Sequence, residues 1–245
     1  MSKGKKVLWI TLIVLFVIVV GDTVGFFVYT SIYYHADQGA IVDFCDDYPD
    51  VKVEPLGDKG VVVKGEEIKA GVVFYPGAKV ESKAYLPLCA ALAQRGYATV
   101  LLNVPFRLAV LSPNRADGVQ KALPEADRWY LAGHSLGGTI ACHYAARHPA
   151  DFDGVILLAS FSDKDLSQTS LTVLSIYGDQ DKVLNRRSYD NARSRYPSDF
   201  DEYVIEGGCH AGFGMYGAQK GDGTPTIDSA AQITLTADYI AAKLG

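Results

Sequence analysis

The feature that most constrains the fold is an alternation of short apolar segments with helical segments, which runs from residue 51 almost to the end of the chain. The apolar segments are rich in β-branched and aromatic residues and predict strands at 51–56, 60–64, 68–75, 97–103, 128–132, 155–160, 171–177 and 202–205. Segments with helical periodicity predict helices at 83–95, 112–122, 136–147, 185–196 and 228–243. This order predicts an α/β fold with a mostly parallel, doubly wound sheet, entered through two short antiparallel strands.

In a sheet of this kind, the loops at the carboxyl ends of the strands carry the chemistry. The strand that ends at Ser160 is separated by only a short segment from the strand that begins at Leu171. That segment has no room for an inserted lid domain, so we expect the site to be open.

The charge balance and the cysteines exclude several classes of function. The net charge is −5 and no run of Lys or Arg follows residue 6, so we expect no nucleic-acid partner. The four cysteines form no C-x-x-C pair and no metal-ligand spacing occurs, so we expect neither a metal nor another cofactor. Cys89 and Cys142 fall on apolar faces of predicted helices and are expected in the core.

The N-terminal segment has the composition of a membrane-targeting sequence. The run from Val7 to Val20 is apolar except for Thr11 and follows three lysines. Extended to Val28 as a helix, with Asp22 inside it, the segment spans about 33 Å and can cross the roughly 30 Å hydrocarbon core of a bilayer. A signal peptide is the alternative, but the segment lacks an A-x-A cleavage site, which favours an uncleaved anchor.

The charges on either side of this segment predict its orientation. Lysines precede it and acidic residues follow it, so the positive-inside rule puts the N-terminus in the cytoplasm and the rest of the chain on the extracytoplasmic side. A cleaved signal peptide would release the rest as a secreted protein on that same side. We expect residues 1–36 to form a signal-anchor and stalk, residues 37–245 to form the globular domain, and the region 30–50 to be irregular.

Residues 133–138 have the sequence GHSLGG and contain a G-x-S-x-G motif. They follow an apolar strand and precede a predicted helix, which is the strand–turn–helix setting of a nucleophile elbow. In such an elbow the tight turn exposes the serine hydroxyl, and glycines avoid collisions of Cβ atoms with the neighbouring strand and helix. The helix N-terminus behind the turn favours a developing oxyanion. Ser135 is therefore the candidate nucleophile.

This motif, the segment YPGA at residues 75–78 and the loop GGCHAGFG at residues 207–214 together resemble the α/β-hydrolase superfamily. More narrowly, they resemble its small, lidless, dienelactone-hydrolase-like members. The resemblance covers residues 60–243 and implies hydrolysis of esters by a Ser–acid–His triad. Dienelactone hydrolases themselves use a cysteine nucleophile, so Ser135 departs from them and argues against a dienelactone substrate.

A serine hydroxyl needs an adjacent base, and the triad order in this fold is Ser, acid, His. Of the five histidines, His210 alone follows a suitable acid and lies in a Gly-rich loop after a strand. Strand alternation turns the side chain of His134 away from that of Ser135. We therefore expect His210 to be the base.

The acid has three candidates, of which Asp181 is favoured. In similar sequences the working acid is the last residue of a G-x-x-D turn, which here is Asp181. Asp179, in the same turn, would then tie the turn together. Asp163 is the third candidate, because some α/β-hydrolases place their acid after the preceding strand.

The oxyanion hole and the substrate pocket are assigned from loop positions. The backbone N–H of Leu136 follows the nucleophile, and that of Ala78 lies in the loop after the first buried parallel strand, so these two are the expected oxyanion donors. Substrate-pocket residues are expected after His210 and at the end of another strand, and they are Phe213, Met215, Tyr216 and Phe106.

We therefore expect a membrane-anchored serine esterase that cleaves a small-molecule ester through an acyl-enzyme on Ser135, with Asp181 and His210 completing the triad. One alternative is an acyltransferase on the same triad, in which an alcohol or amine replaces water. The other is a non-catalytic binding module on a hydrolase scaffold, which the intact Ser, Asp and His disfavour.

Overall fold

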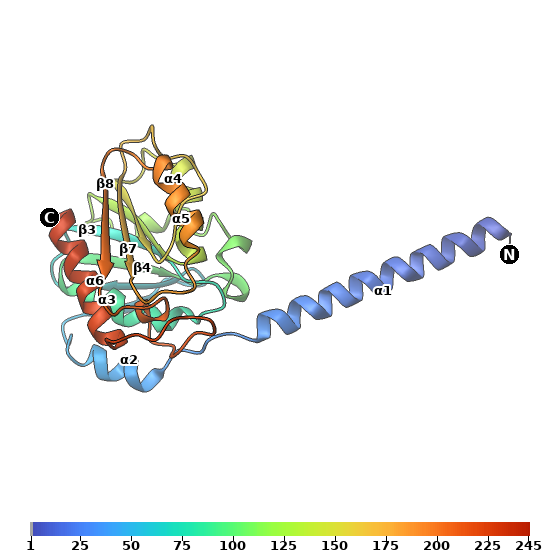
Figure 1. The fold of residues 1–245 in the computed structure, drawn as a ribbon, viewed down its shortest axis with the longest axis horizontal. Coiled ribbons are helices and arrows are strands. Elements are labelled where there is room, and N and C mark those ends of the chain that lie inside the picture. Colours follow the sequence, from blue (N-terminus) through green and yellow to red (C-terminus); the bar gives the residue numbers. More distant parts are fainter. Residues whose placement is uncertain (1) are drawn as a thin grey trace. The chain divides into compact units, whose positions relative to one another are not determined.

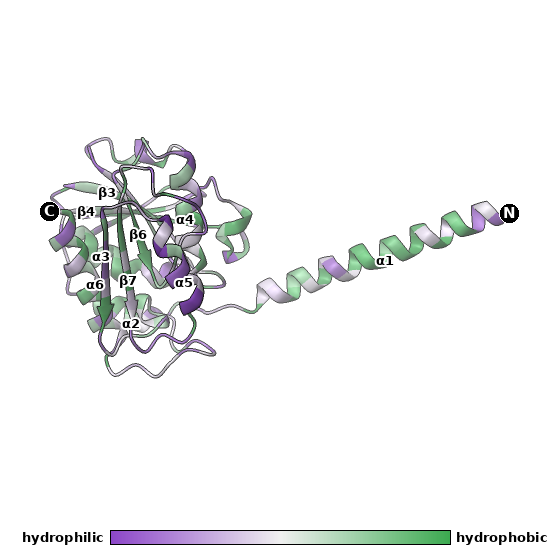
Figure 2. Cartoon of the chain, turned by 45° about the horizontal axis from the view of Figure 1, so that its top comes forward, coloured by the Kyte–Doolittle hydropathy of each residue, from purple (hydrophilic) through white to green (hydrophobic). Residues whose placement is uncertain are grey.

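The computed structural model describes residues 2–245, which divide into two compact units with the boundary between Tyr33 and Tyr34. The first unit holds one long helix, α1 (Lys3–Ser31), and Ser2 caps it by accepting a hydrogen bond from the N–H of Lys5. At 1.5 Å per residue the helix is about 44 Å long. Figure 2 shows hydrophobic colouring over most of α1, with a hydrophilic stretch near the N-terminus.

Within the described part of the chain, α1 is the one helix that is long and apolar enough to cross a membrane. Its apolar residues surround the helix on all sides, which is unlike the one-sided apolar stripe of a helix that packs on a soluble core. A membrane anchor and a signal sequence both fit a helix of this kind at the N-terminus.

The second unit is built on one eight-stranded sheet with the order β1-β2-β4-β3-β5-β6-β7-β8. Strands β1 and β2 pair antiparallel, as do β2 and β4, and all the other neighbouring strands pair parallel. The strands are β1 (Lys52–Pro55), β2 (Gly60–Lys64), β3 (Ala70–Tyr75), β4 (Tyr97–Leu102), β5 (Trp129–His134), β6 (Gly154–Leu158), β7 (Thr172–Gly178) and β8 (Phe200–Ile205). The expected mostly parallel, doubly wound α/β sheet is confirmed.

Helices cover both faces of this sheet (Figure 1). The remaining helices are α2 (Gln38–Cys45), α3 (Leu86–Gln94), α4 (Leu136–Arg147), α5 (Arg186–Ala192) and α6 (Ser229–Leu244). Alternate residues of β3 face opposite sides: Val72 and Phe74 pack with residues of α3 and α6, and Val73 and Tyr75 pack with residues of α4. The cysteines Cys89 and Cys142 are buried in these two layers, as expected.

Two segments differ from the prediction. Residues 112–122 form turns and a short 3₁₀ helix, Val119–Ala122, instead of a helix. Gly118 adopts a left-handed conformation with φ of 68°, which an α-helix does not accommodate. The buried hydroxyl of Tyr75 holds the turn, since it donates to the carbonyl of Pro113 at 2.9 Å and accepts from the N–H of Ala116 at 3.2 Å.

The second difference is α2, which lies in a region that we expected to be irregular. Asp37 caps this helix by accepting from the N–H of Ala40. Ile41 is buried in the core, and Phe44 packs against it, so apolar residues one turn apart dock α2 on the domain. Tyr34 also belongs to this packing.

Candidate active site

The candidate nucleophile Ser135 lies in a strained turn between β5 and α4. Its backbone has φ of 52° and ψ of −126°, which a residue with a side chain adopts only when surrounding contacts impose it. Two hydrogen bonds hold the turn: the N–H of Ser135 donates to the carbonyl of Leu158 at 2.9 Å, and the hydroxyl of Ser160 donates to the carbonyl of Ser135 at 2.6 Å. The neighbouring strand β6 and the segment after it therefore fix the elbow.

The glycines of the motif are required by close packing. A Cβ atom on Gly133 would lie 2.5 Å from the backbone of Gly137 and Gly138 at the start of α4. A Cβ atom on Gly137 would collide with the backbone carbonyl groups of Tyr75 and Pro76. Glycine at these positions lets α4 approach the sheet closely enough to form the turn.

The side chains of His210 and Asp181 form a buried pair. The Nδ1 atom of His210 lies 2.8 Å from Oδ2 of Asp181, and both side chains are almost completely shielded from solvent. The other oxygen, Oδ1, accepts from the N–H groups of Val183 and Leu184, each at 2.8 Å. These contacts fix the carboxylate so that Oδ2 accepts a hydrogen bond from the N–H at Nδ1, and in that tautomer Nε2 of His210 carries the lone pair.

The second ring nitrogen of His210, Nε2, is the atom of this pair that remains available to accept a proton. Among the side chains that the structure describes, Nε2 of His210 is buried and has no hydrogen-bond partner, so no hydrogen bond joins it to Ser135. A buried acceptor without a partner is uncommon and carries a free-energy cost. In hydrolytic sites the bond between base and nucleophile often tightens only when substrate binds.

The other two candidate acids have different partners. Asp179 accepts from the N–H of Gly207 at 2.8 Å and from the amide of Gln180, so it ties the turn as expected. Asp163 lies 2.5 Å from Nε2 of His143, on helix α4. Of the three, Asp181 is the carboxylate that the structure brings to His210.

The expected oxyanion donors lie at the carboxyl ends of two adjacent strands. Strands β3 and β5 are parallel with Tyr75 opposite Gly133, so the loops that hold Ala78 and Leu136 leave the sheet side by side. Leu136 is the first residue of α4, where backbone N–H groups point away from the helix and its dipole is positive. Within residues 2–245, neither N–H has an acceptor among the backbone or side-chain hydrogen bonds.

Residues 71–234 match the model of a family described as the alpha/beta hydrolase family. The chain belongs to the alpha/beta hydrolase family. The resemblance drawn from the sequence motifs is therefore confirmed at this level.

One curated relative of this hydrolase is a protein of Mycobacterium phage D29 that is named a non-heme haloperoxidase. The two are 33% identical over 100 residues, which make up 36% of this chain and 35% of the phage protein. The chain thus spans about a third of the length of that relative.

The loop that carries the hydrolase's candidate base is held by two residues that sequence reasoning missed. The amide side chain of Gln232, on α6, accepts from the N–H of Cys209 and donates to its carbonyl, both at 2.9 Å. Asp222 accepts from the N–H of Ala211 at 2.8 Å. Partial burial would raise the pKa of Asp222, but backbone donors including Ala211 outweigh it and hold the pKa below its usual range.

The cysteine beside His210 is a weak nucleophile. Cys209 is buried, and this burial raises the pKa of its thiol to about 11, with the nearby carboxylate of Asp222 acting in the same direction. The thiol is therefore protonated at neutral pH, and its conversion to thiolate is unfavourable. Within the described chain, no group of three or more His, Cys, Asp or Glu side chains is placed to hold a metal ion.

The four expected pocket residues do not gather into one pocket. Phe213 is fully buried, with its ring 5.7 Å from that of His134. Tyr216 is also buried, against Tyr34 and Tyr85, and Met215 lines a hollow beside α2. The short loop after His210 turns these side chains into the core, and helical or strand periodicity could not have indicated this.

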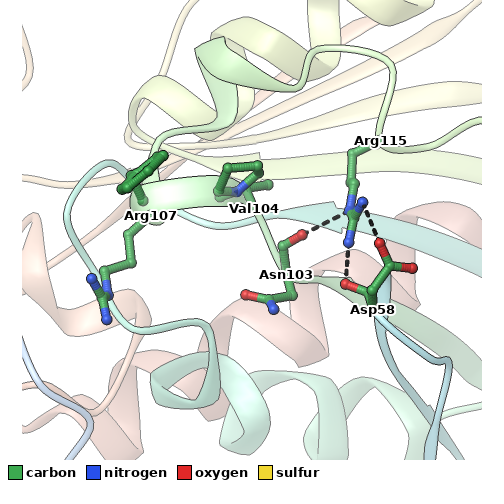
Figure 3. A pocket seen from close by; sticks show the side chains of 7 residues that line it. Asp58, Asn103, Val104, Arg107 and Arg115 are labelled. Atoms are coloured by element: carbon green, nitrogen blue, oxygen red, sulfur yellow. Dashed lines mark hydrogen bonds and ion pairs between the residues drawn. The ribbon is translucent and has the colours of Figure 1, made fainter. Parts of the chain in front are cut away.

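Phe106 lines a different hollow, at the carboxyl end of β4 (Figure 3). This hollow has a volume of about 420 Å³ and is also lined by Asn103 and Arg107. On its other side Arg115 donates to the carbonyl of Asn103 at 2.9 Å and pairs with Asp58. The loop after β4 also contacts the loop that holds Ala78, because the N–H of Lys79 donates to the carbonyl of Arg107.

Proposed function

We propose that this protein is a serine esterase in which Ser135, His210 and Asp181 form the catalytic triad. The observation that carries the proposal is the buried Asp181–His210 pair, whose Nε2 atom is unpartnered in a domain with a strained Ser135 elbow. This combination is what a general base needs in order to accept the proton of the serine hydroxyl. Membership of the alpha/beta hydrolase family supports hydrolytic chemistry in general.

The mechanism follows from these groups. Nε2 of His210 accepts the proton of the Ser135 hydroxyl as its oxygen attacks the ester carbonyl, and the carboxylate of Asp181 stabilises the imidazolium that forms. The backbone N–H groups of Leu136 and Ala78 donate to the oxyanion. His210 then returns the proton to the leaving alcohol, and water, activated by the same base, releases the acid from the acyl-enzyme.

We expect the substrates to be esters with short acyl chains. The segment 161–170, between β6 and β7, is short and contributes no lid. Without a lid, the site offers little apolar surface to cover a long acyl chain. Hydrolysis of p-nitrophenyl acetate and butyrate should therefore be faster than hydrolysis of the palmitate ester. A strong preference for palmitate would contradict this part of the proposal.

The full-length chain in detergent provides the test of ester hydrolysis. Ser135→Ala and His210→Ala should each lower kcat on p-nitrophenyl acetate by about a thousandfold or more. His143→Ala is the matched control, because His143 is a histidine paired with Asp163 away from the candidate triad. Turnover that persists in Ser135→Ala would contradict the proposed nucleophile.

The same acyl-enzyme permits transfer to acceptors other than water. Product analysis with an added alcohol or amine distinguishes an esterase, which forms mainly acid, from an acyltransferase, which forms mainly the new ester or amide. Because the phage relative is named a haloperoxidase, hydrogen peroxide belongs among the acceptors tested. We propose hydrolysis as the main reaction, because the family to which the chain belongs is described as a hydrolase family.

We further propose that α1 anchors the enzyme in a membrane, with the lysines of its first two turns on the cytoplasmic side and the hydrolase domain on the extracytoplasmic side. The length of α1 exceeds the thickness of a bilayer core, and an 18-residue window of the helix has a mean hydropathy of 2.6. An anchored enzyme would act on small-molecule esters outside the cytoplasm.

A further inference from the structure

A series of buried hydrogen bonds joins the loop that holds Gly77 and Ala78, called the oxyanion loop below, to the loop of the candidate base. The N–H of Gly77 lies 3.1 Å from the hydroxyl of Tyr85, which lies 2.8 Å from Nδ1 of His134. Nε2 of His134 lies 3.0 Å from the backbone carbonyl of His210. Tyr85 and both histidines are buried, so water does not compete for these bonds.

The donors and acceptors in this series have one consistent arrangement. The carbonyl of His210 can only accept, so Nε2 of His134 carries a proton and donates to it. Burial, and to a lesser extent the neighbouring His210, lower the pKa of His134 well below its usual value, so its ring is neutral and Nδ1 accepts. The hydroxyl of Tyr85 therefore donates to Nδ1 and accepts from Gly77.

This series of hydrogen bonds ends at two groups that take part in the proposed reaction or adjoin one that does. Gly77 precedes Ala78, whose N–H is an expected oxyanion donor, and His210 carries the base. A Cβ atom on Gly77 would lie 2.7 Å from both the Tyr85 hydroxyl and Nδ1 of His134, so only glycine lets the two side chains reach this backbone. His134 itself stands next to Ser135 in the elbow.

We propose that Tyr85 and His134 are positioning residues that hold the oxyanion donor loop and the catalytic base in a fixed relative placement. This inference rests on the proposed serine-esterase function. Neither side chain touches substrate. Their contribution is to preorganise two groups that lie far apart in sequence and must act on the same carbonyl.

Another buried tyrosine of the core provides a matched control for the role of the Tyr85 hydroxyl. Tyr97 is a second fully buried tyrosine of the same apolar layer, and its hydroxyl has no hydrogen-bond partner among the described residues. Replacing either tyrosine by phenylalanine keeps the ring and removes one oxygen. The effects on packing should be similar in the two variants, whereas only Tyr85→Phe removes hydrogen bonds of this series.

The experiment measures kcat and KM of the full-length chain in detergent on p-nitrophenyl acetate. We expect Tyr85→Phe to lower kcat about tenfold with KM changed less than twofold, and Tyr97→Phe to match the parent. His134→Gln keeps one donor and one acceptor and should retain more activity than His134→Leu. Melting temperatures identify any variant that fails to fold. If His134→Leu fails to fold, the comparison of Tyr85→Phe with Tyr97→Phe still decides the question.

A second readout follows the ring nitrogens of His210 by NMR with ¹⁵N-labelled histidine. We expect their signals to change in Tyr85→Phe and to stay at the parent positions in Tyr97→Phe. Equal kcat and equal His210 signals in both tyrosine variants would overturn the positioning role. If the parent itself hydrolyses no ester, the proposed function fails, and the NMR comparison still decides whether Tyr85 positions His210.

Discussion

Asp181 and His210 are joined through Oδ2 and Nδ1 at 2.8 Å, and the second carboxylate oxygen of Asp181 is occupied by two backbone N–H groups. The carboxylate cannot rotate without losing those two bonds. The pair therefore fixes both the tautomer of His210 and the direction in which its free nitrogen points.

A comparison of Asp181→Asn with Asp163→Asn should separate the roles of these two candidate acids. An amide can keep its oxygen toward Val183 and Leu184 but then turns its NH₂ group toward Nδ1, which favours the wrong tautomer of His210. We expect kcat on p-nitrophenyl acetate to fall about 10³- to 10⁴-fold with little loss of thermal stability. Asp163→Asn, the control, should stay within about threefold of the parent. A large loss in Asp163→Asn with an active Asp181→Asn would reverse the assignment.

Gly137→Ala tests the close approach of α4 to the sheet. The added methyl group would meet backbone carbonyls of Tyr75 and Pro76, which cannot move aside as a flexible side chain would. We expect a destabilisation of about 1–3 kcal/mol or more and loss of esterase activity. Gly39→Ala, in α2, is the control, because the nearest atom to its Cβ lies 3.6 Å away. Thermal unfolding of the two variants checks the difference, and equal stability would argue against the steric account.

The neutral state of His134 predicts how stability depends on pH. Its pKa in the folded chain is lowered well below 6.5, so on acidification the unfolded state takes up a proton near pH 6.5 and the folded state does not. The free energy of unfolding should therefore fall below pH 6.5, by at most about 1.4 kcal/mol per pH unit from this residue. Above pH 6.5 its contribution is constant.

Urea unfolding at pH 7.5 and pH 5.5 measures this dependence. His134→Gln cannot titrate, so its stability should change less between the two pH values than that of the parent. The same change in both proteins would mean that His134 is protonated in the folded state or that other groups dominate.

The N-terminal helix predicts the behaviour of the enzyme in cells. Full-length protein should remain in the membrane fraction after extraction with alkaline carbonate, whereas a chain that begins at Tyr34 should be soluble. Protease added to the outer side of intact cells should digest the hydrolase domain if the lysines lie inside. A full-length protein released as a shorter secreted form would indicate a cleaved signal instead.

Regular periodicity explains why the order of strands and helices was predictable from the sequence. Apolar runs such as 97–103 and 171–177 form β4 and β7, which have neighbouring strands on both sides and are buried on both faces. The helix expected at 112–122 is absent because a hydroxyl from a distant strand, that of Tyr75, organises a turn there. Such a contact has no local signal in the sequence.

The candidate site was predictable where a motif ties residue type to position. Ser135 and His210 stand in Gly-rich loops after strands, and the structure pairs His210 with Asp181. Gln232 and Asp222 were not predictable, because their roles come from contacts across the fold. The pocket residues after His210 were misplaced for the same reason: a loop's backbone decides which aromatic side chains turn inward.

The most direct test of the serine-esterase account is labelling of the full-length chain with a fluorophosphonate, followed by peptide mass analysis. The account predicts one adduct on Ser135 in the parent and in His143→Ala, and none in Ser135→Ala or His210→Ala. A folded parent that is not labelled, or an adduct on another residue, would contradict an activated nucleophile at Ser135.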